Sequence, residues 1–211
     1  LITKRGISKK PIAYIIKKKD FWNSRLYIDK NALIPRPETE ILIEKLSSIF
    51  KNKKSFILDV GTGSGCILIS ILLERPKSTG IGIDISPSAI KVAEFNAKMQ
   101  QLKNRIKFIN SDVDKFFAYK YDIIVSNPPY INKFNFKNLQ KDVKDYEPKV
   151  ALDGGLNGIS MIKKVIEKSS ILIKKNGNLV LEIDNQILKE SKKLLKKYNF
   201  YINDISKDLT N

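Results

Sequence analysis

The stretch Phe56 to Gly65, F-I-L-D-V-G-T-G-S-G, decides the fold of this chain. Its first half is a short apolar run, Phe56 to Val60, of the kind that forms buried strands. Its second half is a turn with glycine at every other position, made of Gly61, Thr62, Gly63, Ser64 and Gly65. The apolar segment Cys66 to Glu74 then reads as a helix. A strand, a glycine turn and a helix in this order predict a parallel α/β sheet with a ligand loop at the end of a strand.

The loop has a spacing that argues for one class of ligand. It reads G-x-G-x-G, whereas dinucleotide-binding loops read G-x-G-x-x-G. Asp59 stands just before it, where a carboxylate would repel a pyrophosphate and hold an ammonium group. S-adenosyl-L-methionine carries such an ammonium and no phosphate. We therefore predict that residues 61–65 bind this cofactor, with a plain tight turn as the alternative for the glycines alone.

Working outward, strands and helices alternate on both sides of this stretch. The expected strands are 80–85, 106–109, 121–126, 178–183 and a last short one near 200–205. Of the expected helices, one ends near Met99, a second spans 159–173 and a third ends near Tyr198. Before the stretch we expect a helix from Pro37 to about Phe50 and a β-hairpin with strands Ile12–Ile16 and Arg25–Ile28. The pattern predicts an α/β, Rossmann-like, doubly wound parallel sheet with a β-hairpin lead-in. We divide the chain into a linker and lead-in, 1–40, and a catalytic domain, 41–211.

Two further strand ends carry acidic residues suited to a nucleoside. Asp84 ends the second strand, where its carboxylate can accept hydrogen bonds from both ribose hydroxyls. The alternative, a helix N-cap, is better served by Ser86. Asp112 follows the third strand and could bind the adenine amino group, with Val113 packing on the ring. For Asp112 a role as helix N-cap is an equally good interpretation.

The most specific motif is Asn127-Pro128-Pro129-Tyr130, which directly follows the expected strand 121–126. Two prolines fix the backbone, so that the Pro128 carbonyl and the Asn127 side-chain carbonyl converge as two acceptors on one planar NH2 group. Tyr130 offers a flat face for stacking. Such acceptors stabilise the positive charge that develops on an amide nitrogen during methylation. We predict Asn127, Pro128 and Tyr130 as catalytic residues, Asn127 to Tyr130 as the substrate site, and Asn127 as a cofactor contact as well.

Composition excludes several other kinds of chemistry. The chain has 211 residues, 39 Lys+Arg against 22 Asp+Glu for a net charge of +17, and no histidine. Without histidine there are no His-based triads, His-ligated zinc sites or histidine pH switches, and we predict no metal site. The single cysteine, Cys66, excludes an internal disulfide and suggests a reducing compartment. There is no apolar run of membrane-spanning length and no signal peptide, so we expect a cytoplasmic protein with no membrane partner.

The positive charge has two interpretations. The lysine runs 17–19, 51–54 and 192–197 could form a nucleic-acid footprint. Only five of the cations are arginine, and no basic and aromatic recognition stripe accompanies them. We therefore favour a solvated lysine face and do not expect nucleic acid to be the primary partner.

The chain resembles the HemK/PrmC-type peptide chain release factor N(5)-glutamine methyltransferases over nearly its whole length. The resemblance rests on P-I-A-Y-I (11–15), F-W (21–22), L-I-P-R-P-E-T-E (33–40), the loop 57–65, N-P-P-Y (127–130), Y-E-P (146–148) and A-L-D-G-G (151–155). It implies a class I S-adenosyl-L-methionine-dependent methyltransferase fold. It also implies that the substrate is the glutamine of the Gly-Gly-Gln motif of class I release factors. The family's N-terminal helical domain is mostly missing, and residues before 12 correspond to its exit linker.

Two alternatives stay open at this point. The N-P-P-Y element also occurs in nucleic-acid amino-methyltransferases, where the same clamp would hold adenine or guanine. A cofactor-binding scaffold without activity, surviving as part of a larger chain, is the second alternative.

Overall fold

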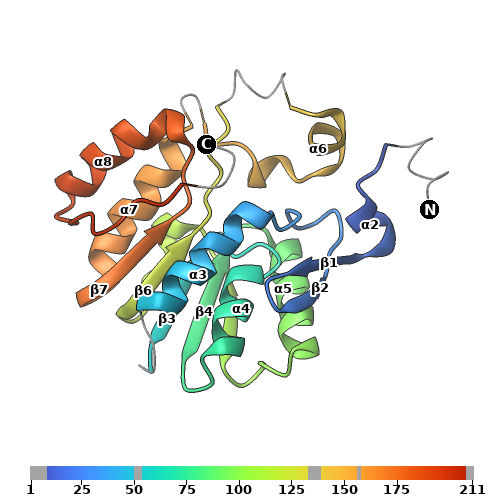
Figure 1. Cartoon of the computed structure of the whole chain (residues 1–211), viewed down its shortest axis with the longest axis horizontal. Coiled ribbons are helices and arrows are strands. Elements are labelled where there is room, and N and C mark those ends of the chain that lie inside the picture. The colour runs from blue at the N-terminus through green and yellow to red at the C-terminus, as the bar shows by residue number, and fades with distance from the viewer. Residues whose placement is uncertain (1–8, 50–53, 133–138, 156–157, 208–211) are drawn as a thin grey trace.

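The computed structural model describes residues 9–49, 54–132, 139–155 and 158–207 (Figure 1). Its centre is a parallel sheet with strand order β5-β4-β3-β6-β7. The strands are β3 (Phe56–Val60), β4 (Thr79–Asp84), β5 (Ile106–Asn110), β6 (Tyr121–Ser126) and β7 (Ile173–Leu181). The α/β fold expected from the alternating pattern is therefore confirmed. β3 and β6 are almost completely buried, as expected for central strands with both faces covered.

Two helical layers cover the sheet because successive side chains of each strand point to opposite faces. Ile57 packs into a cluster with α3 (Glu40–Ile49), α4 (Cys66–Glu74) and α5 (Pro87–Met99). Its neighbour Leu58 packs into a second cluster on the other face, with α7 (Ser160–Leu172) and the 3₁₀ helix η2 (Val113–Lys115). Beyond α7 lie the 3₁₀ helix η5 (Asn185–Ile187) and α8 (Leu188–Lys197), whose apolar side chains pack on Ile162 and Ile166 of α7.

The order of the strands creates a switch point between β3 and β6. The chain adds β4 and β5 on one side of β3, and then returns to add β6 and β7 on the other side. At such a point the loops after neighbouring strands diverge, and ligands of open α/β sheets bind in the crevice at the carboxyl ends. The loop 61–65 follows β3 and residues 127–130 follow β6. The two strongest motifs of the sequence thus leave the sheet on either side of the switch point.

The β-hairpin lead-in exists, but its first strand was placed wrongly. β1 (Lys18–Phe21) pairs antiparallel with β2 (Ser24–Tyr27), whereas residues 12–16 form a short helix, α2 (Ile12–Ile16). Pro11 precedes the first turn, and Lys17, with φ 55° and ψ 33°, ends the helix in a left-handed cap. Ile12 and Ile16 are both about half exposed, so the apolar run is not a buried strand. Phe21 and Leu26 pack into the core cluster with α3 and α4. The domain boundary at residue 40 stays a prediction.

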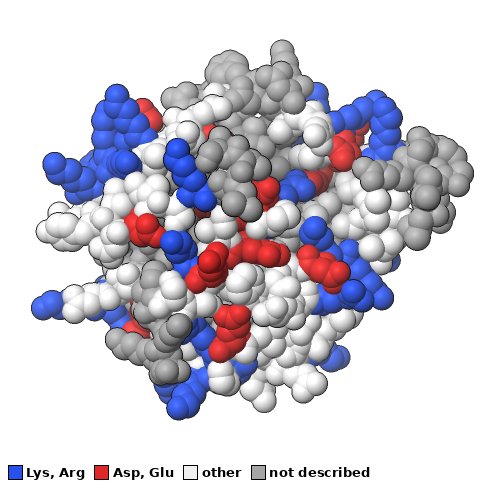
Figure 2. All heavy atoms as spheres, viewed as in Figure 1, with Lys and Arg blue, Asp and Glu red and all other residues white. Residues whose placement is uncertain are grey.

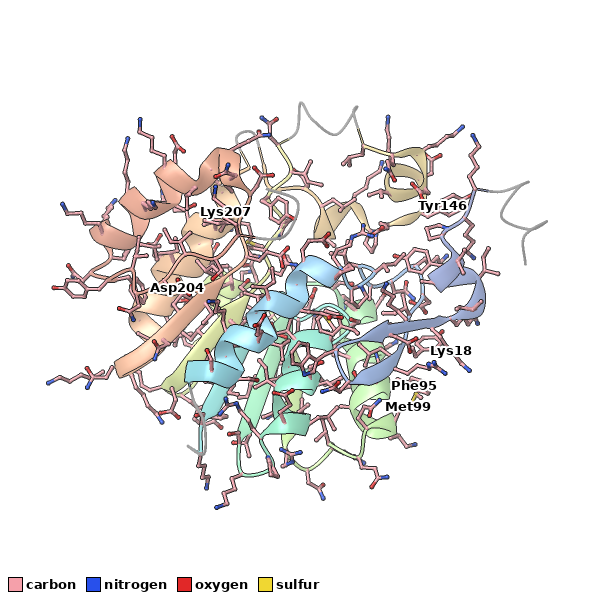
Figure 3. All side chains as sticks on the ribbon, in the orientation of Figure 1. Lys18, Phe95, Met99, Tyr146, Asp204 and Lys207 are labelled. Atoms are coloured by element: carbon pink, nitrogen blue, oxygen red, sulfur yellow. The ribbon has the colours of Figure 1, made fainter. Side chains whose placement is uncertain are left out.

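The other corrections concern the ends of the sheet. No strand forms over 200–205: Tyr201 is 93% exposed, and Asp204, labelled in Figure 3, forms an ion pair of 2.8 Å with Lys45 of α3. The segment after α8 therefore contacts α3 through Asp204 and does not pair with β7. The expected loop after β6 contains α6 (Lys141–Tyr146) and a 3₁₀ turn, η4 (Lys149–Ala151). The helix expected from Pro37 begins as a 3₁₀ turn, η1 (Pro37–Thr39), before α3.

None of the helices in the described part of the chain has the length and apolar character needed to cross a lipid bilayer.

Candidate active site

Four residues at the carboxyl ends of neighbouring strands lie in one row. In the parallel register Val60 is opposite Ile83 and also opposite Ser126, and Ser126 is opposite Leu181. The next residue of each strand or following loop comes one step further along the same edge, and these residues are Gly61, Asp84, Asn127 and Glu182. The register thus brings together three predicted site residues, Gly61, Asp84 and Asn127, and adds a glutamate that the sequence did not single out.

The glycine loop presents its backbone to open space. Gly61, Gly63 and Gly65 all have positive φ, at 73°, 56° and 81°, a conformation that side chains rarely adopt. A Cβ atom at Gly61 would meet nothing within 4 Å, and one at Gly63 would meet only the loop's own Gly61 carbonyl, at 4.0 Å. At Gly65 it would contact side chains of α4, α5 and β5 instead. Gly61 and Gly63 thus allow a ligand to approach, and Gly65 allows close helix packing.

Beneath the loop, Asp59 is fully buried. Its Oδ2 accepts a hydrogen bond of 2.7 Å from the Thr62 hydroxyl, and its Oδ1 has no partner among the described residues. Burial raises the pKa of Asp59 to about 7, the Thr62 hydroxyl opposes the shift, and the nearby Asp84 carboxylate adds to it. Thr62 and Ser64, predicted cofactor residues, are themselves buried. The Thr62 N–H donates to the Ile83 carbonyl at 2.9 Å, and the Ser64 carbonyl accepts from the Asn96 side chain at 2.9 Å, so a cofactor contact for these two residues stays a prediction.

Asp84 fixes the shape of the glycine loop. Its Oδ2 accepts from the Gly63 N–H at 2.9 Å, and its Oδ1 accepts from the Ser86 N–H at 2.9 Å. Burial raises the pKa of Asp84, and these backbone donors oppose the shift. Ser86 caps α5 by accepting from the Ala89 N–H at 3.2 Å, as the sequence predicted. Asp84 is therefore not the cap of that helix, and its carboxylate lies at the loop.

The structure gives Asp112 its alternative role. Its side chain caps the 3₁₀ helix η2 by accepting from the Asp114 N–H at 3.0 Å. Val113 is only 4% exposed and packs in the core cluster of the sheet's second face. Ser111 donates its N–H to the Asp84 carbonyl at 3.0 Å, so Asp112 follows the strand end next to that of Asp84. An adenine contact for Asp112 and Val113 stays a prediction.

The Asn127-to-Tyr130 segment is held by side chains from two distant elements. The Asn127 Nδ2 donates to the Thr39 hydroxyl oxygen at 3.0 Å, and the Tyr130 hydroxyl lies 3.5 Å from the Glu182 carboxylate. Burial, with Glu182 next in effect, raises the pKa of Tyr130 to about 12, so the phenol stays protonated near neutral pH. Asn127 is partly accessible while Pro128 is buried. Thr39 and Glu182 were missed because nothing in the sequence links them to residues 127–130. Thr39 lies within the motif 33–40, and Glu182 lies within the expected strand 178–183.

The A-L-D-G-G segment, 151–155, contacts the backbone at the end of residues 127–130, which we call the clamp. Gly154 donates its N–H to the Ile131 carbonyl at 2.9 Å, and Ile131 and Asp153 form an isolated parallel bridge. A Cβ atom at Gly154 would come within 2.8 Å of the Tyr130 backbone, and one at Gly158 would come within 2.4 Å of the Tyr130 carbonyl oxygen. Because Gly154 and Gly158 have no Cβ atom, their backbone can lie this close to the backbone of Tyr130. The sequence indicated the segment, but not this role.

A small lobe next to the clamp joins the lead-in to α6. Tyr14, Ile28 and Ile34 form a buried cluster that Tyr146, labelled in Figure 3, packs against. Beside it the Arg36 guanidinium bonds to the Glu147 carboxylate at 2.6 Å. Glu147 is only 5% exposed, and its burial raises the pKa of this carboxyl although Arg36 opposes the shift. The Y-E-P and L-I-P-R-P-E-T-E motifs thus meet in one ion pair.

The charges of the molecule are segregated around this site. Figure 2 shows acidic atoms across the middle of the face that carries α3, with Lys and Arg atoms mostly around its margin. Glu38 raises the pKa of Glu182, and Asp184 raises that of Tyr130. The surroundings of the clamp are therefore acidic in a chain whose net charge is +17.

Comparison with known proteins agrees with this geometry. A family model described as a methyltransferase domain matches residues 51–210. The chain is 39% identical to the release factor glutamine methyltransferase of Flavobacterium psychrophilum, covering 95% of this chain and 72% of that protein. It is 40% identical, with the same coverage, to the protein of that name from Buchnera aphidicola subsp. Acyrthosiphon pisum. The solved structure of ribosomal protein L11 methylase from Lactobacillus delbrueckii subsp. bulgaricus has a TM-score of 0.63 at 18% identity, covering 86% of this chain and 78% of that one. That structure confirms the class I methyltransferase fold alone.

Proposed function

Because the chain belongs to the release factor glutamine methyltransferase family, the HemK/PrmC-type family it was expected to resemble, we propose a specific activity for it. It transfers a methyl group from S-adenosyl-L-methionine to the side-chain amide nitrogen of the glutamine in the Gly-Gly-Gln motif of class I peptide chain release factors. The observation that carries the proposal is the row Gly61, Asp84 and Asn127 along one edge of the sheet. The row supports the proposal because it brings the residues that we assign to cofactor binding, Gly61 and Asp84, next to Asn127, which we assign to the substrate amide.

The residues present fit the cofactor. The open backbone at Gly61 and Gly63 leaves room for the methionine part. The Asp59 carboxyl is buried beneath the loop, and a cationic ammonium near the loop would favour its ionised form. The Asp84 carboxylate, at the tip of β4, can accept from ribose hydroxyls. When bound, the cofactor supplies an electrophilic methyl group on a sulfonium. Asp112 and Val113 complete the proposed site at the next strand end.

The clamp supplies positioning and charge stabilisation. The Asn127 side-chain carbonyl and the Pro128 backbone carbonyl accept the two hydrogens of the glutamine NH2 group, which holds the nitrogen lone pair toward the methyl group. These acceptors interact more strongly as the nitrogen becomes positive, so they favour the transition state over the ground state. Pro129 keeps the backbone extended, and the Tyr130 ring stacks on the planar amide. The acceptors would thus hold the amide nitrogen in line with the methyl group that a bound cofactor supplies, and the proton that the nitrogen gives up on methylation would leave to solvent.

Transfer of labelled methyl groups tests the proposal. The full chain is incubated with labelled cofactor and a class I release factor, or with the same factor whose motif glutamine is changed to alanine. We expect label in the first factor only. Equal labelling of both factors would exclude the proposed substrate, and labelling of RNA or DNA instead would favour the nucleic-acid alternative.

Asn127→Ala separates enzyme from scaffold. We expect turnover to fall by at least about 100-fold, the effect of removing one oriented group that stabilises a transition state, and cofactor affinity to fall far less, because the other predicted cofactor residues are unchanged. A wild-type chain that binds the cofactor but labels none of these substrates would support the alternative hypothesis of a cofactor-binding scaffold without activity. We also propose a cytoplasmic location, which the single cysteine suggests.

A further inference from the structure

Two aromatic side chains lie exposed on the segment between η2 and β6. Phe117 is 69% exposed and Tyr119 is 68% exposed. The residues that alternate with them, Phe116 and Ala118, pack in or against the core cluster of the sheet's second face instead. The segment thus turns every second side chain outward, and both outward positions carry a flat ring. Neighbouring apolar groups that stay in contact with water indicate a surface that binds a partner.

Both rings are held on one side by the protein. Lys168 of α7, only 6% exposed, places its Nζ 3.4 Å from the centre of the Phe117 ring and donates to the Asp114 carbonyl at 2.8 Å. The Tyr119 ring meets the Phe56 ring edge to face, with 5.7 Å between the ring centres. Tyr119 also has a φ of 64°, a left-handed conformation that bulky side chains rarely adopt. The two rings are therefore fixed in place while most of their surface faces solvent.

Lysines lie next to the two rings. Lys115 precedes them in η2 and Lys120 follows them directly, and both are exposed. The Lys120 Nζ donates to the carbonyl of Ile171 at the end of α7, which leads straight into β7. The start of β7 therefore lies beside Lys120, and it carries two more exposed lysines, Lys174 and Lys175.

The acidic residues of this region are already paired. Asp114 forms an ion pair with Lys164, and Asp122 forms one of 2.9 Å with Lys174. Three of the exposed lysines form no ion pair with a carboxylate in the described part of the chain, namely Lys115, Lys120 and Lys175. The surface around the two rings thus has an excess of positive charge.

This surface lies far from the clamp. Phe56 begins β3 and Tyr119 comes just before β6, whereas the clamp follows β6 at its other end. The six residues of β6 rise by about 3.3 Å each, so its two ends are about 17 Å apart. None of the lysine runs 17–19, 51–54 and 192–197 contributes to the surface. Its rings and cations come together only in the folded chain.

From these observations we propose that Lys115, Phe117, Tyr119, Lys120 and Lys175, which we call the aromatic edge, bind single-stranded RNA. Bases stack on the two rings and phosphates contact the lysines, the combination by which proteins bind single strands without reading their sequence. A duplex hides the faces of its bases, and an acidic peptide would leave the two rings unused. We choose RNA because cells hold single strands mainly as RNA and keep DNA as duplex. The site is separate from methyl transfer, since none of its residues belongs to the proposed cofactor or substrate site.

Fluorescence anisotropy of a labelled oligouridine of about 12 nucleotides measures binding by the full chain. At about 0.15 M salt we expect a Kd of about 1–100 µM, the range of binding without sequence preference. An RNA duplex of the same length should bind at least about fivefold more weakly. Equal binding of duplex and single strand, tighter binding of the matching deoxyribonucleotide strand, or displacement by polyglutamate as efficient as by unlabelled oligouridine would each overturn the proposal.

Leucine variants test whether the flat rings are used. Phe117→Leu and Tyr119→Leu keep an apolar side chain without a ring, and each should raise the Kd by about tenfold. Tyr119→Phe keeps the ring and should bind within about twofold of the wild type. The matched control is Phe95→Leu, at a 48% exposed aromatic residue on α5, which covers the other face of the sheet and is labelled in Figure 3. Leucine variants of the edge that bind like the wild type, or an equal loss in Phe95→Leu, would refute the stacking role.

Salt dependence tests the lysines. Lys120→Ala should reduce the slope of log Kd against log salt by about 0.7, the value for one phosphate contact on a single strand. Lys98→Ala, at an exposed position of α5, should leave the slope unchanged. An equal change in both variants would show diffuse attraction to the whole cationic surface and refute a site at the aromatic edge.

Methyl transfer separates this inference from the proposed function. Phe117→Leu should label the release factor within about twofold of the wild-type rate, because the ring lies at the opposite end of β6. Loss of RNA binding with methyl transfer intact would support two separate sites. A variant that keeps its urea-unfolding profile but loses both properties would contradict the separation. RNA binding is measured without cofactor or release factor, so it decides the inference even where methyl transfer fails.

Discussion

Gly154→Ala is the sharpest perturbation of the clamp, because it acts on the backbone of Tyr130 without removing any group from the site. A Cβ atom at Gly154 would lie 2.8 Å from the Cα and the carbonyl carbon of Tyr130, where ordinary contacts begin at about 3.4 Å. The clamp must therefore move by about 0.6 Å or more. Displacements of about 1 Å in a positioned site can cost about 100-fold in rate. We expect kcat to fall by about 10- to 100-fold, with about 1–3 kcal/mol lost in the free energy of unfolding.

The assay measures methyl transfer, cofactor affinity and urea unfolding on the same preparation. Cofactor affinity should change by less than about threefold, because the glycine loop follows β3 and does not contact Gly154. Gly80→Ala is the matched control: its Cβ would come within 2.6 Å of Leu68 and 3.1 Å of the Ile57 carbonyl, near the start of β4 and away from the clamp. It should lose stability and keep kcat. A folded Gly154→Ala variant with wild-type kcat would refute the role of Gly154 in positioning the clamp. A fall in kcat of the same size in Gly80→Ala would refute it as well.

Three further variants probe the cofactor side of the site. The Asn96 amide, fully buried on α5, forms hydrogen bonds of 2.7–3.0 Å with the N–H and the carbonyl of Tyr27 and with the Ser64 carbonyl. Asn96→Ala should therefore lower the free energy of unfolding in urea by about 2–4 kcal/mol. Lys98→Ala, at an exposed position of the same helix, is the control and should change it by less than about 0.5 kcal/mol. Asp84→Asn should raise the cofactor Kd by about tenfold or more in calorimetric titration, because it loses the charge that the Gly63 N–H and the ribose use. For Asp59, the folded-state pKa of about 7 against 3.8 means that the folded chain holds a proton the unfolded chain releases. Stability should therefore fall as pH rises from about 4 to about 7, and Asp59→Asn should flatten this slope by up to about 1.4 kcal/mol per pH unit; an unchanged slope would contradict the assignment.

The sequence predicted best where local chemistry alone sets the structure. The strand Phe56–Val60, the three glycines with positive φ and the helix Cys66–Glu74 appear as expected, because a buried apolar run, a backbone free to turn and a following apolar helix need no distant partner. The run Ile12–Ile16 was misread because five apolar residues fit a strand or a helix equally well. The structure is decided there by Pro11 at its start and by Lys17 in a left-handed conformation at its end.

The site shows the complementary limit. Gly61, Asp84 and Asn127 could be found because each lies at the end of a strand or directly after it, and parallel strands end at one edge. Thr39 and Glu182 could not, because the contact of Thr39 with Asn127 depends on the turn η1, and the contact of Glu182 with Tyr130 depends on the pairing of Ser126 with Leu181. The role of Gly154 likewise depends on a bridge between Ile131 and Asp153. Register and long-range bridges are properties of the folded chain that no local motif encodes.

The distribution of charge explains why the net +17 says so little about the chemistry. The carboxyls along the active edge, Asp59, Asp84 and Glu182, all have raised pKa values, and in each case burial is the largest cause. The next effects come from hydrogen-bond donors and from other carboxyls, including Glu38. Lysines on the margin act through water and salt, which screen charges beyond about 8 Å. The edge is thus an acidic, partly desolvated strip that suits a cationic cofactor, whatever the lysine-rich surface around it contributes. A chain without histidine can work there because its proposed reaction needs oriented acceptors and a positioned methyl group rather than a neutral base.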